Sequence, residues 1–429
     1  MSDQPINWDK LLRDFRENRC ILLLGPRVAT LGHNGQAGTA QEQLAGYLAG
    51  LLSQEGLPLE TGDSCTLPYL AQQYARGKQD LLVDLWDKVA DFYQQHLNAV
   101  PAVYHRLAAL PVSIAVNTAP DNMLVDAWLQ ENKLPWFRHY NFRRNKALDL
   151  RMEQINPQKP LLYNLFGSLQ DKESLVLTPA DHLVFIRRIL EKNPRVPDEL
   201  VAQFSPFNTY VFLGFDWEDW PLRLLIDALN LCQNTAFSPE SGQYPLFPAT
   251  RSFYEERFHF HFINQDINTF ADRIVNGLSS LRSDVPKKVV LVAAPEDWGI
   301  LQGLEKYLAP LERNAGWTVF HRERVLTGQD TEAEMKRQMV EADAVLLLLS
   351  SDFFSNPALL DGDLEWARSK LQMHSEAVIP VIARACDWRA DRDLRRITPL
   401  PEDSLPIATS PDRDEAYQRI VEQLKRRLT

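Results

Sequence analysis

The sequence predicts an α/β protein made of two doubly wound domains, each with a parallel sheet that is covered by helices on both faces. Short and almost wholly apolar strands alternate with helical segments along the chain, which is typical of buried parallel strands. The alternation stops at the polar segment 281–288 and then starts again. We therefore expect one domain over residues 1–282 and a second over residues 287–429.

Each expected element follows from its hydrophobic pattern. In the first domain, apolar runs predict strands at 20–25, 112–118, 160–167, 209–215 and 258–264. Helical periodicity predicts helices at 8–18, 39–55, 67–76, 79–108, 219–232 and 267–282. In the second domain, strands at 289–294, 317–320, 344–350 and 377–383 alternate with helices at 298–313, 330–341, 362–372 and 412–428.

Composition narrows the class of protein. The net charge of −11 disfavours a general binder of nucleic acids or anionic membranes. The four cysteines are scattered and form no CxxC pair, which is typical of free thiols in a reducing compartment; they are Cys20, Cys65, Cys232 and Cys386. The start "MSDQPINWDK" is too polar for a signal peptide, and no run approaches the ~20 apolar residues of a membrane span. We expect a cytoplasmic protein with no membrane partner.

The stretch "ADAVLLLLSSDFFSNPALLDGDLEWARSK" (342–370) holds a first candidate site. Its apolar strand ends at Ser350, and a helix is expected to begin near Gly362. Glu365 would then lie in the first turn of that helix, near the carboxyl ends of the strands, where the helix dipole favours an anion. Considered alone, this residue is explained more simply as a surface glutamate at a helix start.

Together with three further stretches, this segment resembles the TIR domains of bacterial immune and signalling proteins. The stretches are "LQGLEKYLAPLERNAGWTVFHRERVLTGQD" (301–330), "VIPVIARACDW" (378–388) and "DRDEAYQRIVEQLKRRL" (412–428). The resemblance covers about 287–429 and implies a flavodoxin-like fold. Many such domains cleave NAD at the nicotinamide–ribose bond with one glutamate. That residue matches Glu365 best, with Asp361 and Asp363 as alternatives because the preceding loop is slightly longer than usual.

A carboxylate suits this reaction because bond breaking builds positive charge on the ribose. No metal or other cofactor is required, and NAD is the substrate. The resemblance also implies substrate-binding positions, which are Ala294, Trp298, Arg322 and Asp352 in this sequence. Packing explains Trp298 more simply than stacking on a ligand. His321 and Gly328 belong to the loop 321–330 that would build or gate the pocket, with Gly328 supplying a permissive turn.

The TIR-like segment departs from the pattern of active relatives in two places. Ala293 and Ala294 stand where those relatives carry a serine or aromatic pair. The residues 320–322 read "FHR" where a W-x-D pattern is common. These changes concern substrate affinity more than fold, and they leave open a domain that only assembles with partners.

In the first domain, four stretches in order resemble the sirtuin-like domains of bacterial defence proteins, over roughly 7–280. They are "CILLLGPRVA" (20–29), "AALPVSIAVNTAPDNMLVDAW" (108–128), "PLLYNLFGSLQDKESLVLTPADHLVFI" (160–186) and "YVFLGFDWEDWPLRLLI" (210–226). The resemblance implies a Rossmann-like fold with an NAD pocket at three strand ends. Active members carry G-A-G in the first turn, T-N-Y-D in the second and L-H-G-S in the third.

This chain has lost the chemical groups of that pocket. Its first turn is Gly25-Pro26-Arg27, so a bulky residue and a proline without an N–H replace the small residues. The second turn, "TAPD" (118–121), has Ala119 in place of the asparagine and keeps Asp121. The third has Phe166 in place of the histidine before Gly167, and phenylalanine cannot transfer a proton.

We therefore expect a folded but inactive sirtuin-like domain that serves oligomerisation or, with Arg27 on a phosphate, senses a nucleotide. The leading hypothesis for the whole chain is an NAD glycohydrolase in antiviral defence, controlled by assembly into a homo-oligomer or filament. The alternatives are a non-enzymatic TIR scaffold and a nucleotide sensor. In "FHFHF", His259 and His261 are expected on one face of a strand, but no third ligand is evident, so we expect no metal.

Overall fold

The computed structural model describes residues 6–28, 30–33, 36–56, 66–76, 79–96, 100–144, 150–231, 235–242, 246–280, 287–373 and 376–428. The chain divides into two compact units, Met1–Ser280 and Leu281–Thr429. Each unit contains a parallel sheet with helices on both faces, so the predicted fold class is confirmed. Most of the polar segment 281–288 lies outside the described residues, and the described chain resumes at residue 287.

The first unit is built on a seven-stranded sheet with the order β5-β6-β4-β1-β7-β8-β9, in which all neighbouring strands are parallel. The chain moves outward in one direction from β1 through β4 and then in the other through β7, so β1 and β7 flank the switch point of the sheet. The strands are β1 (Cys20–Leu24), β4 (Ile114–Asn117), β5 (Trp136–His139), β6 (Leu161–Asn164), β7 (Thr209–Leu213), β8 (Ala236–Pro239) and β9 (Phe260–Ile263).

Helices cover both faces of this sheet because each presents an apolar stripe to it. One core holds residues of α1 (Trp8–Arg16), α5 (Ala102–Ala108), α6 (Met123–Gln130) and α11 (Ile267–Ser280). The other holds residues of α7 (Pro179–Glu191), α8 (Asp198–Val201), α9 (Trp220–Ala228) and α10 (Pro248–Phe258). A capping box of Thr178 and Asp181, with Pro179 at the first helical position, begins α7.

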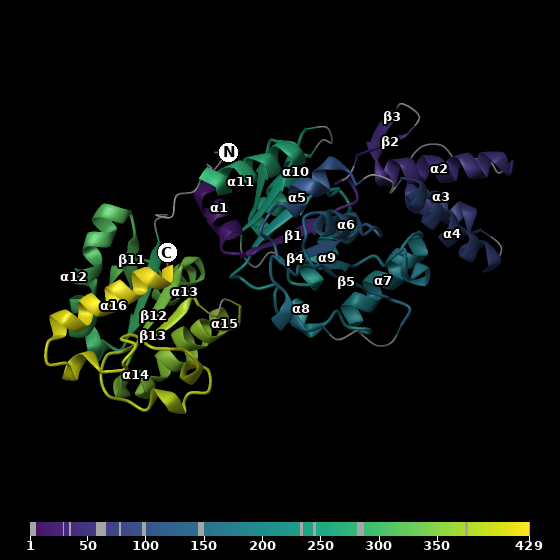
Figure 1. Ribbon diagram of the computed structural model, residues 1–429. Coiled ribbons are helices and arrows are strands. Elements are labelled where there is room, and N and C mark those ends of the chain that lie inside the picture. The colour runs from purple at the N-terminus through teal and green to yellow at the C-terminus, as the bar shows by residue number, and fades with distance from the viewer. Residues whose placement is uncertain are drawn as a thin grey trace. The chain divides into compact units, whose positions relative to one another are not determined.

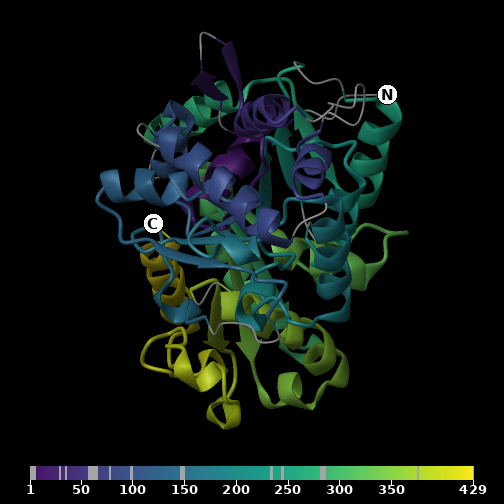
Figure 2. The same cartoon turned by 90° about the vertical axis from the view of Figure 1, so that its right-hand side faces the viewer.

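A helical segment is inserted between β1 and β4 (Figure 1). It starts with a hairpin of β2 (Thr30–His33) and β3 (Gln36–Thr39), and continues with α2 (Ala40–Gln54), α3 (Leu67–Tyr74) and α4 (Gln79–His96). Figure 2 turns these helices, drawn in purple and blue, toward the viewer. Their buried residues Leu48, Leu70 and Val89 join the first core, so the insertion is packed onto the unit.

The second unit has a four-stranded parallel sheet with the order β11-β10-β12-β13. Its switch point lies between β10 and β12. The strands are β10 (Lys288–Ala293), β11 (Thr318–His321), β12 (Ala344–Leu349) and β13 (Val378–Ile382). Helices α12 (Trp298–Ala315) and α16 (Arg413–Leu428) pack on one face, and α13 (Thr331–Glu341), α14 (Ser351–Ser355) and α15 (Glu365–Met373) on the other (Figure 1).

A buried lysine joins α15 to the end of α13. The side chain of Lys370 is only 1% exposed, and its ammonium group donates to the carbonyl oxygens of Met339 (2.8 Å), Val340 (3.2 Å) and Ala342 (2.6 Å). These carbonyls belong to the last turn of α13 and the residue after it, where a helix has no backbone donors left. The lysine therefore satisfies the end of α13 from inside the core and brings positive charge to the negative end of its dipole.

The structure corrects several details of the sequence prediction. The helix expected at 79–108 is two helices, α4 and α5, and Pro101 directly precedes the second. His259 and His261 do not share a strand face, because His259 is the left-handed cap of α10 (φ 56°) and β9 begins only at Phe260. Strands β5 and β8 and the hairpin β2–β3 were not expected. Of the four cysteines, Cys20 and Cys386 are free thiols, and the other two lie outside the described residues.

Candidate functional site

The first turn of the expected sirtuin-like pocket is filled by the protein's own backbone. At the end of β1, the Gly25 N–H donates to the Leu213 carbonyl (2.8 Å), and the Arg27 N–H donates to the Gly214 carbonyl (2.9 Å). A Cβ on Gly25 would lie 2.3 Å from the Gly214 carbonyl oxygen. Gly214 itself has φ 70° and would meet the backbone of the first turn. The close approach that glycine allows here thus joins β1 to the end of β7.

The guanidinium of Arg27 faces carboxylates. It pairs with Asp216 at 2.6 Å, in the turn that follows β7. The same turn holds Asp219, whose pKa is raised to about 6 by burial and by the charge of Asp216. Burial also raises the pKa of Glu240, at the end of β8, and Arg27 opposes that rise. These carboxylates would repel the phosphate that the sensor hypothesis places on Arg27.

The second turn is held by asparagine side chains. The Nδ2 atoms of Asn117 and Asn164 both donate to the Asp121 carbonyl, at 3.2 and 2.8 Å. The Oδ1 atom of Asn117 accepts from the N–H of Ala119 at 2.9 Å. The Asp121 side chain is 2% exposed, and burial raises its pKa to about 6. The turn is therefore rigid, and its one carboxylate is turned into the protein.

Asp121 is expected to make the stability of the first unit depend on pH. The unfolded chain releases this proton near pH 3.8, whereas the folded protein holds it up to about pH 6, so folding becomes less favourable as the pH rises between these values. Asp121→Asn removes this loss. Between pH 4 and pH 7 the wild type should therefore lose up to about 3 kcal/mol of unfolding free energy that the variant keeps.

Urea unfolding at the two pH values measures this shift. Glu131→Gln, at the exposed end of α6, is the matched control and should leave the pH dependence as it is in the wild type. An Asp121→Asn protein with the pH dependence of the wild type would contradict the expectation.

The third turn carries Phe166 where the resemblance implies a histidine. The Phe166 ring lies edge-to-face against His182 (5.6 Å between ring centroids) and Phe185 (4.9 Å). Gly167 has φ 88°, and a Cβ there would lie 2.2 Å from the Ser174 carbonyl oxygen. Burial lowers the pKa of His182, so this neighbouring ring stays neutral. The position of the expected general base is thus part of an aromatic cluster.

A histidine–carboxylate pair that the sequence did not reveal lies one strand away. His139, at the carboxyl end of β5, lies 3.0 Å from Asp171 through Nε2. The same carboxylate oxygen also accepts from Asn141 (2.9 Å) and pairs with Arg144 (3.0 Å). With three partners on one oxygen, the carboxylate joins the end of β5 to the turn after β6. β5 is short and half-buried throughout, so no alternation in the sequence marked it.

In the second unit, a buried carboxylate lies at the carboxyl edge of the sheet. Asp363 belongs to a π-helical turn (Leu359–Leu364) that leads into α15, and its side chain is only 5% exposed. Arg322, the first residue after β11, donates to Asp363 at 3.0 Å and also pairs with Glu332 at the start of α13. Burial raises the pKa of Asp363, and the Arg322 charge opposes this rise. A strand end and two helix starts therefore converge on one carboxylate.

Glu365, the residue that the resemblance favoured, points another way. It is two positions beyond Asp363, at the junction of the π-helical turn and α15, so its side chain leaves the helix on a different side. The side chain is 56% exposed and its carboxylate pairs with Arg368 on the same helix. Arg368 in turn binds Asp391 at 2.5 Å. Of the three acids that the sequence offered, the structure brings Asp363 to Arg322. Asp361 lies in the same π-helical turn and is exposed.

A second ionic network occupies the switch point between β10 and β12. Asp297 is fully buried and binds Arg384, which follows β13, at 2.6 Å. Its other oxygen accepts from Ser350, directly after β12, at 2.5 Å. The Arg384 guanidinium also pairs with Asp352, a predicted substrate-binding residue. These pairs raise the pKa of Arg384, so the guanidinium stays charged. Neither Asp297 nor Arg384 was expected from the sequence.

The other predicted pocket residues are spread over the edge of the sheet. Ala294 is buried in the core under α13 and α15. His321 points to the opposite face, where it contacts Glu305 (3.2 Å) and lies edge-to-face against Trp298 (5.2 Å). Trp298 is thus used in packing. Gly328 has φ 93°, which confirms the permissive turn. The structure unites Arg322 with Asp363, and Asp352 with Asp297, in two separate groups.

The described residues offer neither a metal site nor a membrane span. No group of three or more His, Cys, Asp or Glu side chains within them is arranged to hold a metal ion. None of the helices in the same ranges combines the length and apolar composition needed to cross a bilayer.

Comparison with known proteins agrees with this geometry. Residues 113–256 match the family described as SIR2-like domain, and residues 304–421 match the TIR domain. The chain is also 30% identical over 129 residues to the uncharacterized protein y4lF of Sinorhizobium fredii (strain NBRC 101917 / NGR234). That alignment covers 30% of this chain and 40% of the relative. The chain therefore carries a SIR2-like domain followed by a TIR domain, in the order that the sequence predicted.

Proposed function

We propose that the TIR domain cleaves NAD at the nicotinamide–ribose bond, with Asp363 as the carboxylate that stabilises the ribosyl cation. Nicotinamide leaves as a neutral molecule, so positive charge moves onto the ribose as the bond breaks. A buried carboxylate at the carboxyl edge of the sheet is suited to balance that charge. This single observation carries the proposal, because Glu365 is exposed and paired along its own helix.

Arg322 would act as a positioning residue. Its guanidinium binds Asp363 and Glu332 together, which fixes the orientation of the Asp363 carboxylate and favours its ionised form. Arg322 lies directly after β11, so a movement of the loop that follows this strand would change the charge available to substrate. The SIR2-like domain, with Phe166 at the base position, would contribute assembly and regulation. Consumption of NAD in an infected cell would then serve antiviral defence.

The test is to incubate the purified full-length protein with NAD over a series of protein concentrations and to follow nicotinamide by chromatography. An enzyme that assembles into an active homo-oligomer should release nicotinamide at a rate that rises more steeply than the protein concentration. Absence of release at every concentration, including chemically cross-linked protein, would reject the proposal.

A second function, a non-enzymatic assembly module, is favoured by a different observation. Arginines already balance the acids of the strand ends, with Arg384 between Asp297 and Asp352, and Arg322 between Glu332 and Asp363. A carboxylate whose charge is already balanced has less to offer a cation. In that case the protein would form oligomers while the nicotinamide assay stays silent, so the same experiment separates the two functions.

A further inference from the structure

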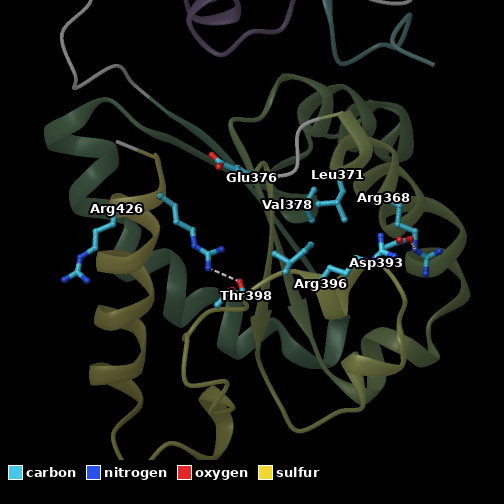
Figure 3. Close-up of a pocket in the computed structure, with 10 residues that line it drawn as sticks. Arg368, Leu371, Glu376, Val378, Asp393, Arg396, Thr398 and Arg426 are labelled. Carbon is cyan, nitrogen blue, oxygen red and sulfur yellow. Dashed lines mark hydrogen bonds and ion pairs between the residues drawn. The ribbon is translucent and has the colours of Figure 1, made fainter. Parts of the chain in front are cut away.

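A cavity of about 690 Å³ opens at the opposite end of the TIR sheet (Figure 3). Val378, the first residue of β13, lines it, whereas Arg384 and the ionic networks lie beyond the other end of that strand. The last turn of α16 contributes Arg426 and Arg427, and the segment that runs beside β13 contributes Thr398. The volume lies within the range of ~300–1,000 Å³ that is usual for pockets that bind small molecules.

Four arginines and two acids, Glu376 and Asp393, line this cavity, so its lining is basic although the protein is acidic overall. Arg368 is occupied by Glu365, Asp391 and Asp393. In contrast, no carboxylate among the described residues pairs with Arg396, Arg426 or Arg427. Arg427 donates to the Thr398 carbonyl, at 2.9 Å, and this bond to a neutral group does not balance its charge. Arg396 is exposed at the rim of the cavity.

The dipole of α16 does not account for all three arginines that have no carboxylate partner among the described residues. Cations in the last turn of a helix gain from its negative end, which is sufficient reason for Arg426 and Arg427 to lie there. Arg396, however, belongs to a short 3₁₀ turn (Leu394–Arg396), so its charge is brought to the cavity from a separate part of the chain. Figure 3 shows Arg426 pointing away from the other labelled residues, whereas the bond of Arg427 to Thr398 holds that side chain at the lining.

The cavity also has an apolar part. Val378 is buried, and Leu371 and Ile397 are partly buried around it. In Figure 3, Leu371 and Val378 lie at the centre of the lining, between Arg368 and Arg426. A ligand that fits both parts has a flat, weakly polar ring for the centre and an anionic group for the arginines. Guanidinium groups bind phosphate with particular geometric fit.

We propose that this cavity binds a nucleoside monophosphate, with the phosphate on Arg396 and Arg427 and the base over Leu371 and Val378. The site is separate from the proposed catalytic edge, so it requires no NAD cleavage and would be occupied whether or not the TIR domain is an enzyme.

Isothermal titration calorimetry of the full-length protein with AMP, at low salt, tests the proposal. We expect binding that weakens as salt is added. Arg396→Gln should weaken it at least about tenfold, and this variant loses no ion pair within the described part of the chain. Arg427→Gln should have a similar effect. Arg426→Gln removes the same charge from the same helix turn, but its side chain points away, so it should stay within about twofold of the wild type.

Two other titrations test the phosphate contact and the base contact separately. Adenosine should bind much more weakly than AMP, and pyrophosphate should also bind more weakly, because each lacks one of the two contacts. Equal affinity of adenosine and AMP, equal affinity of pyrophosphate and AMP, or unchanged AMP affinity in Arg396→Gln would each overturn the proposal. Absence of heat up to 1 mM AMP would overturn it as well. Since the readout is binding, failure here is distinct from a silent nicotinamide assay.

Discussion

Asp363→Asn should reduce nicotinamide release by at least about 100-fold, whereas Glu365→Gln should change it by no more than about threefold. The reason is placement: the Asp363 carboxylate is buried at the strand ends beside Arg322, and that of Glu365 is exposed and bound to Arg368. Loss of one preorganised electrostatic partner of a transition state typically costs a factor of about 10²–10³. Both substitutions keep the size of the side chain and remove one charge, so they form a matched pair.

Nicotinamide release by the two variants and the wild type, at equal protein concentration, measures this difference. Thermal unfolding must accompany it, because Asp363→Asn weakens the contact with Arg322. The reverse ranking, with Glu365→Gln silent and Asp363→Asn active, would show that the helix presents its exposed acid to substrate. It would return the catalytic role to the residue that the resemblance favoured.

Lys370→Met should lower the unfolding free energy of the TIR domain by about 3 kcal/mol. The ammonium group is the donor for three carbonyl oxygens at the end of α13, and methionine fills a similar volume without a donor. Each buried carbonyl left without a partner costs about 1–3 kcal/mol, and release of a buried charge offsets part of that sum. For a unit of this size the loss corresponds to a fall in melting temperature of roughly 6–12 °C.

Calorimetry of the full-length protein measures the fall, and hydrogen exchange of residues 331–373 assigns it to the contact between α13 and α15. Lys306→Met, on an exposed position of α12, is the control and should stay within about 0.5 kcal/mol of the wild type. A melting temperature of Lys370→Met within 2 °C of the wild type would mean that the three carbonyls find other partners.

The fold was predictable where the strands are buried on both faces. Continuous apolar runs such as Cys20–Leu24, Thr209–Leu213 and Ala344–Leu349 identify central parallel strands directly. β5, with the sequence "WFRH", is half-buried throughout, and β8 ends at Pro239, so neither has a comparable pattern. The prediction that the two histidines of "FHFHF" share a strand face was wrong for a related reason. The alternation there crosses from the end of a helix into a strand.

The candidate site was predictable only in part, because its contacts depend on helix phase and on distant residues. The sequence offered three acids near one helix start, and a π-helical turn determines which of them faces the strand ends. Asp297 and Arg384 are 87 residues apart, and only the order of the strands brings them together. Phe166, by contrast, was correctly placed at the end of a strand, because the resemblance locates it by its neighbours.

The contact between Gly25 and Gly214 means that conservation of these two glycines would not by itself indicate function. Each glycine is required by the backbone of the other strand end, so selection for folding alone would preserve both in active and inactive descendants. Their presence in a relative is therefore uninformative about NAD binding, whereas the residue that matches Phe166 shows whether a candidate base is present. By the same reasoning, a Phe166→His variant would gain a base and still carry Arg27 and Asp216 at the first turn. Sirtuin-type chemistry in this domain would therefore need coordinated changes at several strand ends.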